Sequence, residues 1–115
     1  ERIKLNGIIY DTGWYKNFYN SEVYYGPNRP IIPKELISYI EYRNFNFFGC
    51  DLPSVDATNS KNKPIHNALL KQDKIIYESL TNLDQLPLLK QFEFYGFPLN
   101  LDGLDGSPVR ALAII

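Results

Sequence analysis

The 115-residue chain has a net charge of −1, with 44% hydrophobic and 22% charged residues, a balance typical of a folded globular protein rather than a disordered one. The near-neutral charge gives no electrostatic basis for binding nucleic acid or an acidic membrane, and no apolar run approaches the ~20 residues of a transmembrane helix. The single cysteine, Cys50, excludes an intrachain disulfide and fits a cytoplasmic location; we expect it to be buried and inert.

The first predicted element is a strand over residues 4–10, which are rich in β-branched and aromatic side chains. It ends at the turn Asp11-Thr12-Gly13-Trp14, where Gly13 can take a positive φ. Residues 15–30 are aromatic but show no apolar period, so they are predicted to form an irregular loop. Two roles fit this loop equally well: covering the mouth of a pocket, or packing around Trp14.

A helix is predicted to begin at Pro33, whose missing N–H suits a first helical turn, and to end near Asn44. A short buried strand follows over residues 45–51. Residues 56–63 are polar and predict a loop, and Pro64 then starts a short helix that runs to about Lys71.

Three strands complete the pattern, over residues 74–77, 91–97 and 109–115, and a glycine-punctuated loop joins the last two. Strands therefore outnumber helices, and the helices are short. We predict a single domain over residues 1–115 of the α+β class, a layered β-sheet with short helices on one side.

One histidine and one glutamate carry the clearest chemical signal. His66 lies in the first turn of the predicted helix, where the positive end of the helix dipole favours neutral imidazole, the form that binds metal. Glu78 ends the following strand, so a helix-then-strand arrangement can bring the two side chains together. Asp51 and Asp56 add negative charge nearby in the sequence. Taken alone, a single histidine is more often an ordinary surface or core residue.

Several motifs in this order resemble the metal-dependent cyclase and kynurenine formamidase family, in its C-terminal half. They are Asp11-Thr12-Gly13-Trp14, Gly49-Cys50-Asp51-Leu52-Pro53-Ser54-Val55-Asp56, Pro64-x-His66-x-x-Leu69-Leu70, Ile75-x-x-Glu78, Phe97-Pro98-Leu99 and Gly103-x-Asp105-Gly106-Ser107-Pro108-Val109-Arg110-Ala111. The resemblance implies part of a swivelling β/β/α domain.

The resemblance also implies a function. The matching histidine and glutamate of the family act at a divalent metal, so His66 and Glu78 are the expected metal ligands and catalytic residues. Zn²⁺ is the first choice, and Mn²⁺ or Fe²⁺ also suits a histidine with a carboxylate. The implied enzyme is an arylformamidase-like hydrolase of small amides, formamides or cyclic amides, such as N-formylkynurenine in tryptophan catabolism.

The family's other metal ligands, in a His-x-Gly-Thr-His-x-Asp motif, have no counterpart in these 115 residues. The chain also lacks methionine and begins Glu1-Arg2-Ile3, so we expect a fragment of a longer product, with N-terminal processing as the alternative. A catalytic zinc site typically needs three protein ligands. We therefore expect this chain alone to bind metal weakly or not at all, and to be inactive.

Four further residues are candidates for the substrate pocket: Trp14, Asp51, Ser54 and Arg110. Each also has a structural interpretation: a core tryptophan, a turn-capping carboxylate, a turn serine and an ion-paired arginine, respectively. The competing functional hypothesis is a degenerate or split family member that serves as a non-catalytic assembly subunit. In either case we expect a homo-oligomer or pairing with the missing half, because a divided fold leaves strand edges unpaired.

Overall fold

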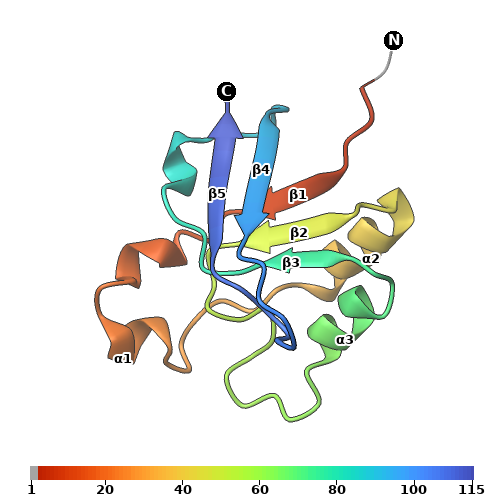
Figure 1. Cartoon of the computed structure of the whole chain (residues 1–115). Helices are drawn as coiled ribbons and strands as arrows, with labels where there is room; N and C mark the ends of the chain where they lie inside the picture. The colour runs from red at the N-terminus through yellow and green to blue at the C-terminus, as the bar shows by residue number, and fades with distance from the viewer. Residues whose placement is uncertain (1–2) are drawn as a thin grey trace. The chain divides into compact units, whose positions relative to one another are not determined.

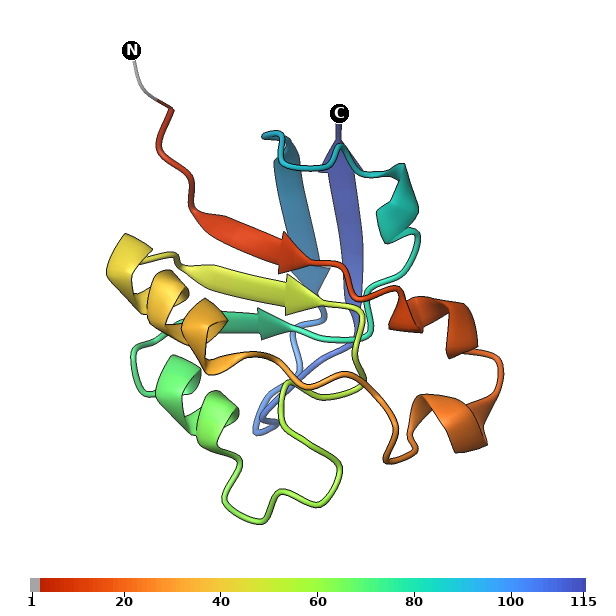
Figure 2. The ribbon, with the colours of Figure 1, turned by 180° about the vertical axis from the view of Figure 1, so that it is seen from behind.

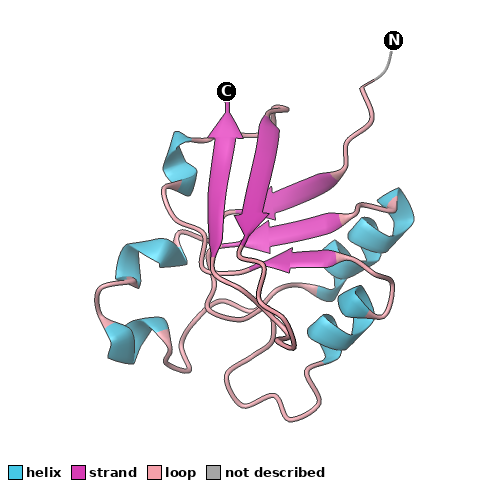
Figure 3. Cartoon of the chain, viewed as in Figure 1, coloured by secondary structure: helices cyan, strands magenta, loops and turns pink. Residues whose placement is uncertain are grey.

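The computed structural model describes residues 3–115 and divides the chain into two compact units. The first unit ends at Leu83, and the second is Asp84–Ile115. Helices and strands are short in both, as Figure 3 shows, and the predicted mixture of sheet with short helices is confirmed.

The first unit is built on a parallel sheet in the order β1 (Gly7–Tyr10), β2 (Phe47–Cys50) and β3 (Ile75–Tyr77). Parallel neighbours need a long crossover, usually helical. These crossovers contain α2 (Lys34–Arg43) and α3 (Pro64–Leu70), which lie on the same face of the sheet (Figures 1 and 2). The carboxyl ends of all three strands therefore meet at one edge, where ligands of such sheets bind.

The core of this unit lies between the sheet and the two helices. Its buried residues are Ile32, Ile37, Ile40, Phe45, Phe48, Cys50, Leu52, Val55 and Leu69. Phe48 and Cys50 come from the central strand, which explains why its short run is almost wholly apolar. Burial also raises the pKa of the Cys50 thiol to about 12, so this cysteine is unreactive at neutral pH.

The predicted helix boundaries hold to within about a residue. Pro33 is the residue before α2 rather than part of its first turn, and Asn44 ends the helix in the left-handed conformation, with φ 51°. The buried Lys74 donates from Nζ to the carbonyl of Phe45 at 2.7 Å, which fixes the end of this helix to the start of β3. Pro64 is in the first turn of α3, as predicted.

The segment predicted to be an irregular loop over residues 15–30 contains two short helical elements. These are η1 (Trp14–Asn17) and α1 (Ser21–Tyr24). Gly13, at φ 80°, turns the chain into η1, and the Asn20 side chain accepts from the N–H of Val23 to cap α1. Single helical turns of this kind are set by local caps and carry no apolar period, which is why the sequence pattern did not predict them.

The second unit is an antiparallel hairpin of β4 (Glu93–Pro98) and β5 (Val109–Ile114), and η2 (Leu83–Gln85) lies at the junction of the two units. The strands of residues 3–115 thus form two separate sheets. In the hairpin loop, Ser107 accepts from the N–H of Leu99 at 2.8 Å and donates to the carbonyl of Pro108 at 2.8 Å. None of the helices described is both long and apolar enough to span a lipid bilayer.

Candidate functional site

Asp51 lies at the carboxyl end of β2, is fully buried, and joins this strand to the turn after β1. Its carboxylate accepts from the N–H and Oγ1 of Thr12, at 3.1 and 2.7 Å, and from the N–H of Tyr15 at 3.1 Å. Its carbonyl accepts from the hydroxyl of Tyr24 at 2.9 Å. With three donors, this carboxylate is satisfied within the protein, which fits the structural interpretation better than substrate contact.

The other pocket candidates are placed in different surroundings. The half-buried Trp14 donates from its indole N–H to the carbonyl of Tyr24 at 3.0 Å and packs against the core. The Ser54 hydroxyl accepts from the N–H of Asp56 at 3.2 Å within its own turn. Arg110 is exposed on β5 of the second unit, opposite Phe97.

A hollow of about 140 Å³ is walled mainly by aromatic rings and includes Ser79, the residue after Glu78, in its lining. Its lining residues are Tyr15, Phe18, Tyr19, Tyr24, Ser79, Leu80 and Thr81. Phe18 and Tyr24 meet edge to face, with ring centroids 5.3 Å apart. The aromatic segment after Trp14 therefore both contacts Trp14, through Tyr24, and forms one wall of a pocket.

His66 lies in the first turn of α3, and its orientation is set by Asp56. One oxygen of Asp56, Oδ1, accepts from the N–H of Ile65 at 2.9 Å. The other, Oδ2, accepts from the N–H of His66 at 3.0 Å and lies 2.7 Å from Nδ1 of its ring. Lys63, the residue before the helix, makes no side-chain cap, so the buried Asp56 caps α3 from across the loop.

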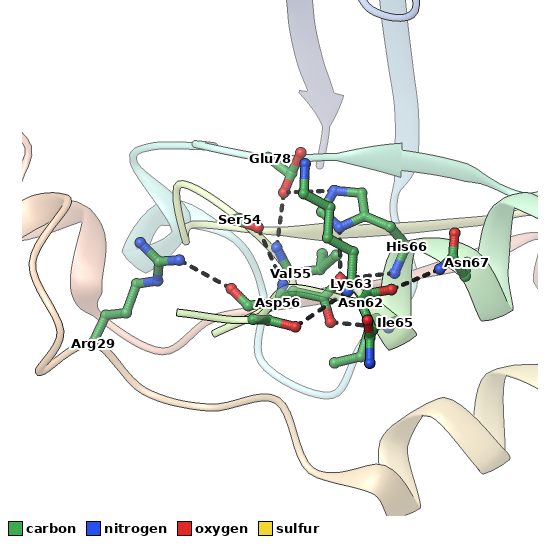
Figure 4. A network of polar contacts seen from close by, with 11 residues as sticks. Arg29, Ser54, Val55, Asp56, Asn62, Lys63, Ile65, His66, Asn67 and Glu78 are labelled. Carbon is green, nitrogen blue, oxygen red and sulfur yellow. Dashed lines mark hydrogen bonds and ion pairs between the residues drawn. The ribbon is translucent and has the colours of Figure 1, made fainter. Parts of the chain in front are cut away.

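The other ring nitrogen of His66 faces Glu78, which follows β3 directly (Figure 4). Nε2 of His66 is 3.5 Å from Oε2 of Glu78, and the same oxygen accepts from the N–H of Val55 at 2.8 Å. The predicted meeting of His66 and Glu78 is thus present. Both side chains are partly exposed, so a ligand can approach them.

The His66 and Glu78 donor atoms fit two ligands of one metal ion. With zinc–ligand bonds of about 2.1 Å, two ligands of a tetrahedral site lie about 3.4 Å apart, close to the observed 3.5 Å. No group of three or more His, Cys, Asp or Glu side chains within residues 3–115 is arranged to hold a metal ion. The two atoms are thus spaced as two ligands of one cation would be, and a catalytic zinc site typically needs three protein ligands.

Sequence reasoning did not identify the role of Asp56. It counted this residue only as one of the acids near His66, because a contact between residues ten positions apart, across a polar loop, leaves no period in the sequence. The one available signal was a helix that begins Lys63-Pro64 with no capping side chain of its own. An upstream aspartate is a natural partner for such uncapped N–H groups.

The contacts of Asp56 predict a specific acid sensitivity. Burial raises the pKa of Asp56, but hydrogen bonds from the backbone N–H groups of His66 and Ile65 and from the His66 ring outweigh burial, so the pKa lies below its ordinary value. A lowered folded-state pKa contributes stability above the unfolded-state pKa, and that stability is lost as pH falls through the folded-state value. In urea unfolding at decreasing pH, wild type should lose more stability than Asp56→Asn. An equal loss of unfolding free energy in wild type and Asp56→Asn as pH falls would contradict this expectation.

Comparisons with known proteins converge on one group of hydrolases. No protein-family model matches the chain. The chain is 33% identical to a kynurenine formamidase of Geobacillus thermodenitrificans over 115 residues, which cover 96% of the chain and 52% of the relative. It is 37% identical to a kynurenine formamidase of Polaromonas naphthalenivorans over 76 residues, which cover 66% of the chain and 33% of the relative.

Solved structures that resemble the chain are also hydrolases. An isatin hydrolase bound to the product analogue thioisatinate superposes with a TM-score of 0.85 at 27% identity, over 99% of this chain and 47% of its own. Isatin hydrolase A from Labrenzia aggregata superposes with a TM-score of 0.81 at 31% identity, over 97% of this chain and 47% of its own. The chain belongs to the cyclase and kynurenine formamidase family. The family resemblance and the fold class read from the sequence are both confirmed, and the chain spans about half the length of the relatives it matches.

Proposed function

We propose that the complete protein is a metal-dependent hydrolase of small amide, formamide or cyclic amide substrates, and that this chain supplies two of its metal ligands, His66 and Glu78. The observation that carries the proposal is the 3.5 Å separation of Nε2 and Oε2, which suits one shared cation. The named relatives, kynurenine formamidases and isatin hydrolases, support hydrolysis of an amide. Zn²⁺ is the metal we favour, because the 3.5 Å separation is close to that of two ligands in a tetrahedral zinc site.

The chain's own residues have separable tasks in this mechanism. A divalent metal, when bound, supplies Lewis-acid activation of water and of the substrate carbonyl. His66 offers Nε2 towards the metal, while Asp56 holds its other nitrogen. Glu78 uses Oε2 to accept from Val55, and its second oxygen accepts none of the hydrogen bonds described above. That oxygen is therefore suited to take the proton from the attacking water and return it to the leaving group.

The hollow lined by Ser79, the residue after Glu78, suggests the shape of the substrate. Its walls are mainly aromatic, its volume is about 140 Å³, and Ser79 on its rim directly follows Glu78. A cavity of about this size can hold a single six-membered ring. We propose that the substrate places a planar ring there and its amide next to Glu78, as N-formylkynurenine-like compounds allow.

A partner that completes the site is part of the proposal. The hairpin of the second unit exposes apolar strand residues, among them Phe97, Leu112 and Ile114, and a lone two-stranded hairpin is at best marginally stable. We propose that it pairs with polypeptide equivalent to the remaining half of the relatives. A non-catalytic assembly subunit, the alternative function, would use the same pairing. Missing metal ligands in the complete reading frame would favour that alternative.

Metal titration of the 115-residue chain tests the proposal directly. Wild type should bind Zn²⁺ weakly in isothermal titration calorimetry, because only two ligands are present, and His66→Ala should abolish measurable binding. Asn67→Ala, an exposed neighbour on α3, is the matched control and should bind like wild type. Equal Zn²⁺ binding by wild type and His66→Ala would refute the metal site. Metal-dependent turnover by this chain alone would refute the proposal that its metal site is incomplete.

A further inference from the structure

Asp56 makes more contacts than the cap of a helix requires. Its carboxylate meets two backbone N–H groups and Nδ1 of His66, at 2.9, 3.0 and 2.7 Å. An ionised carboxylate can only accept hydrogen bonds. A ring nitrogen 2.7 Å from it is therefore the protonated one, and the neutral imidazole carries its proton on Nδ1.

The rest of Asp56 is held just as firmly. Its own N–H donates to Ser54 Oγ at 3.2 Å, and its carbonyl accepts from Nη2 of Arg29 at 2.9 Å. The side chain is almost fully buried. Hydrogen bonds thus hold the N–H, the carbonyl and the carboxylate of Asp56 before any ligand is present, as Figure 4 shows.

We propose that Asp56 is a positioning residue that holds His66 in the tautomer protonated at Nδ1 and so presents the lone pair of Nε2 to Glu78. The tautomer assignment stands on the contacts alone, and its purpose rests on the proposed function. With the proton on Nδ1, two acceptors, Nε2 and Oε2, face each other at 3.5 Å and attract a cation between them. A carboxylate on the far nitrogen also makes imidazole a stronger ligand.

The competing explanation is that Asp56 only caps α3. A cap needs the N–H groups of Ile65 and His66, and it is indifferent to which ring nitrogen carries the proton. The tautomer therefore separates the two roles. His66 is the only histidine of the 115 residues, so its ring signals need no assignment by mutation.

The test is long-range ¹H–¹⁵N correlation NMR of the metal-free 115-residue chain in alkaline buffer, where free imidazole is neutral. Wild type should show a protonated Nδ1 and an unprotonated Nε2 as the main form. In Asp56→Asn, the amide NH₂ faces the N–H of Ile65 in one amide orientation and both the N–H and Nδ1 of His66 in the other, and both orientations lose the charge that favours a proton on Nδ1. The ratio of the two tautomers should therefore fall by about tenfold or more, the value of a charge-assisted hydrogen bond.

Asp51→Asn is the matched control. It also removes the charge of a buried aspartate with three donors, but those donors come from Thr12 and Tyr15 rather than His66. It should lower stability and leave the wild-type tautomer in place. An unchanged tautomer in folded Asp56→Asn would overturn the proposal. If that variant does not fold, the wild-type spectrum still decides, because a main form protonated at Nε2 contradicts it.

The experiment keeps this proposal separate from the metal site. The spectra are recorded without metal and without substrate, so they report only what Asp56 does to His66. If the expected tautomer is present but hydrolysis by the complete gene product does not depend on His66, the proposed function is refuted and the positioning role stays intact. A chain that binds Zn²⁺ with the opposite tautomer would refute the positioning role alone.

Discussion

Replacing Asp51 by alanine should lower the free energy of unfolding by about 4 kcal/mol, a large share of the stability of a domain this size. The carboxylate is fully buried and accepts from Thr12 twice and from Tyr15 once. Alanine leaves these donors without an acceptor in a place that water does not readily reach, and each orphaned donor costs about 1–3 kcal/mol. Urea unfolding followed by circular dichroism measures the loss.

Asp11→Ala is the matched control for this effect. Asp11 lies in the turn that Asp51 contacts but is exposed, and among the described residues its side chain accepts a hydrogen bond only from the N–H of Gly13, at 2.9 Å. Its loss should cost about 1 kcal/mol or less. A similar cost for the two variants would mean that Asp51 is an ordinary turn aspartate. It would also reopen its assignment to the substrate pocket.

Local pattern was sufficient for the regular elements and insufficient for how they assemble. The strand that ends at Cys50 and the helix that starts at Pro64 were predictable because a buried apolar run and a proline in a first helical turn act within a few residues. The pairing of strands was not, because a parallel sheet and a separate hairpin can be built from the same short strands. Register depends on side chains far apart in the sequence, which no period encodes.

The candidate site divides in the same way. The meeting of His66 and Glu78 could be predicted, because a short helix followed by a strand can bring its first turn close to the end of that strand, and the family motifs named both residues. Asp56 could not be assigned a role, because it acts through a contact with His66 across a polar loop. Asp51 illustrates the reverse case. Its place at a strand end fitted either a pocket residue or a turn-capping carboxylate, and its three internal donors fit the capping role.

The largest functional effect is expected at His66. In the complete gene product, His66→Ala should lower kcat/KM for an amide substrate such as N-formylkynurenine by about 10³-fold or more. The substitution removes Nε2, the proposed ligand atom. Metal activation contributes several kcal/mol to the stabilisation of a transition state, and about 1.4 kcal/mol corresponds to a tenfold change in rate. Initial rates of formate release, measured in metal-supplemented buffer, give this ratio.

Two variants give that result its meaning. Glu78→Gln keeps the size of the side chain and the acceptor for the Val55 N–H but loses the charge, so it should lower kcat more than it raises KM, as expected for a group that transfers a proton. Asn67→Ala lies one residue from His66 with an exposed side chain, and it should retain near wild-type activity. If His66→Ala lost no more activity than Asn67→Ala, hydrolysis would not pass through this pair, and the assembly role would become the better account of the chain.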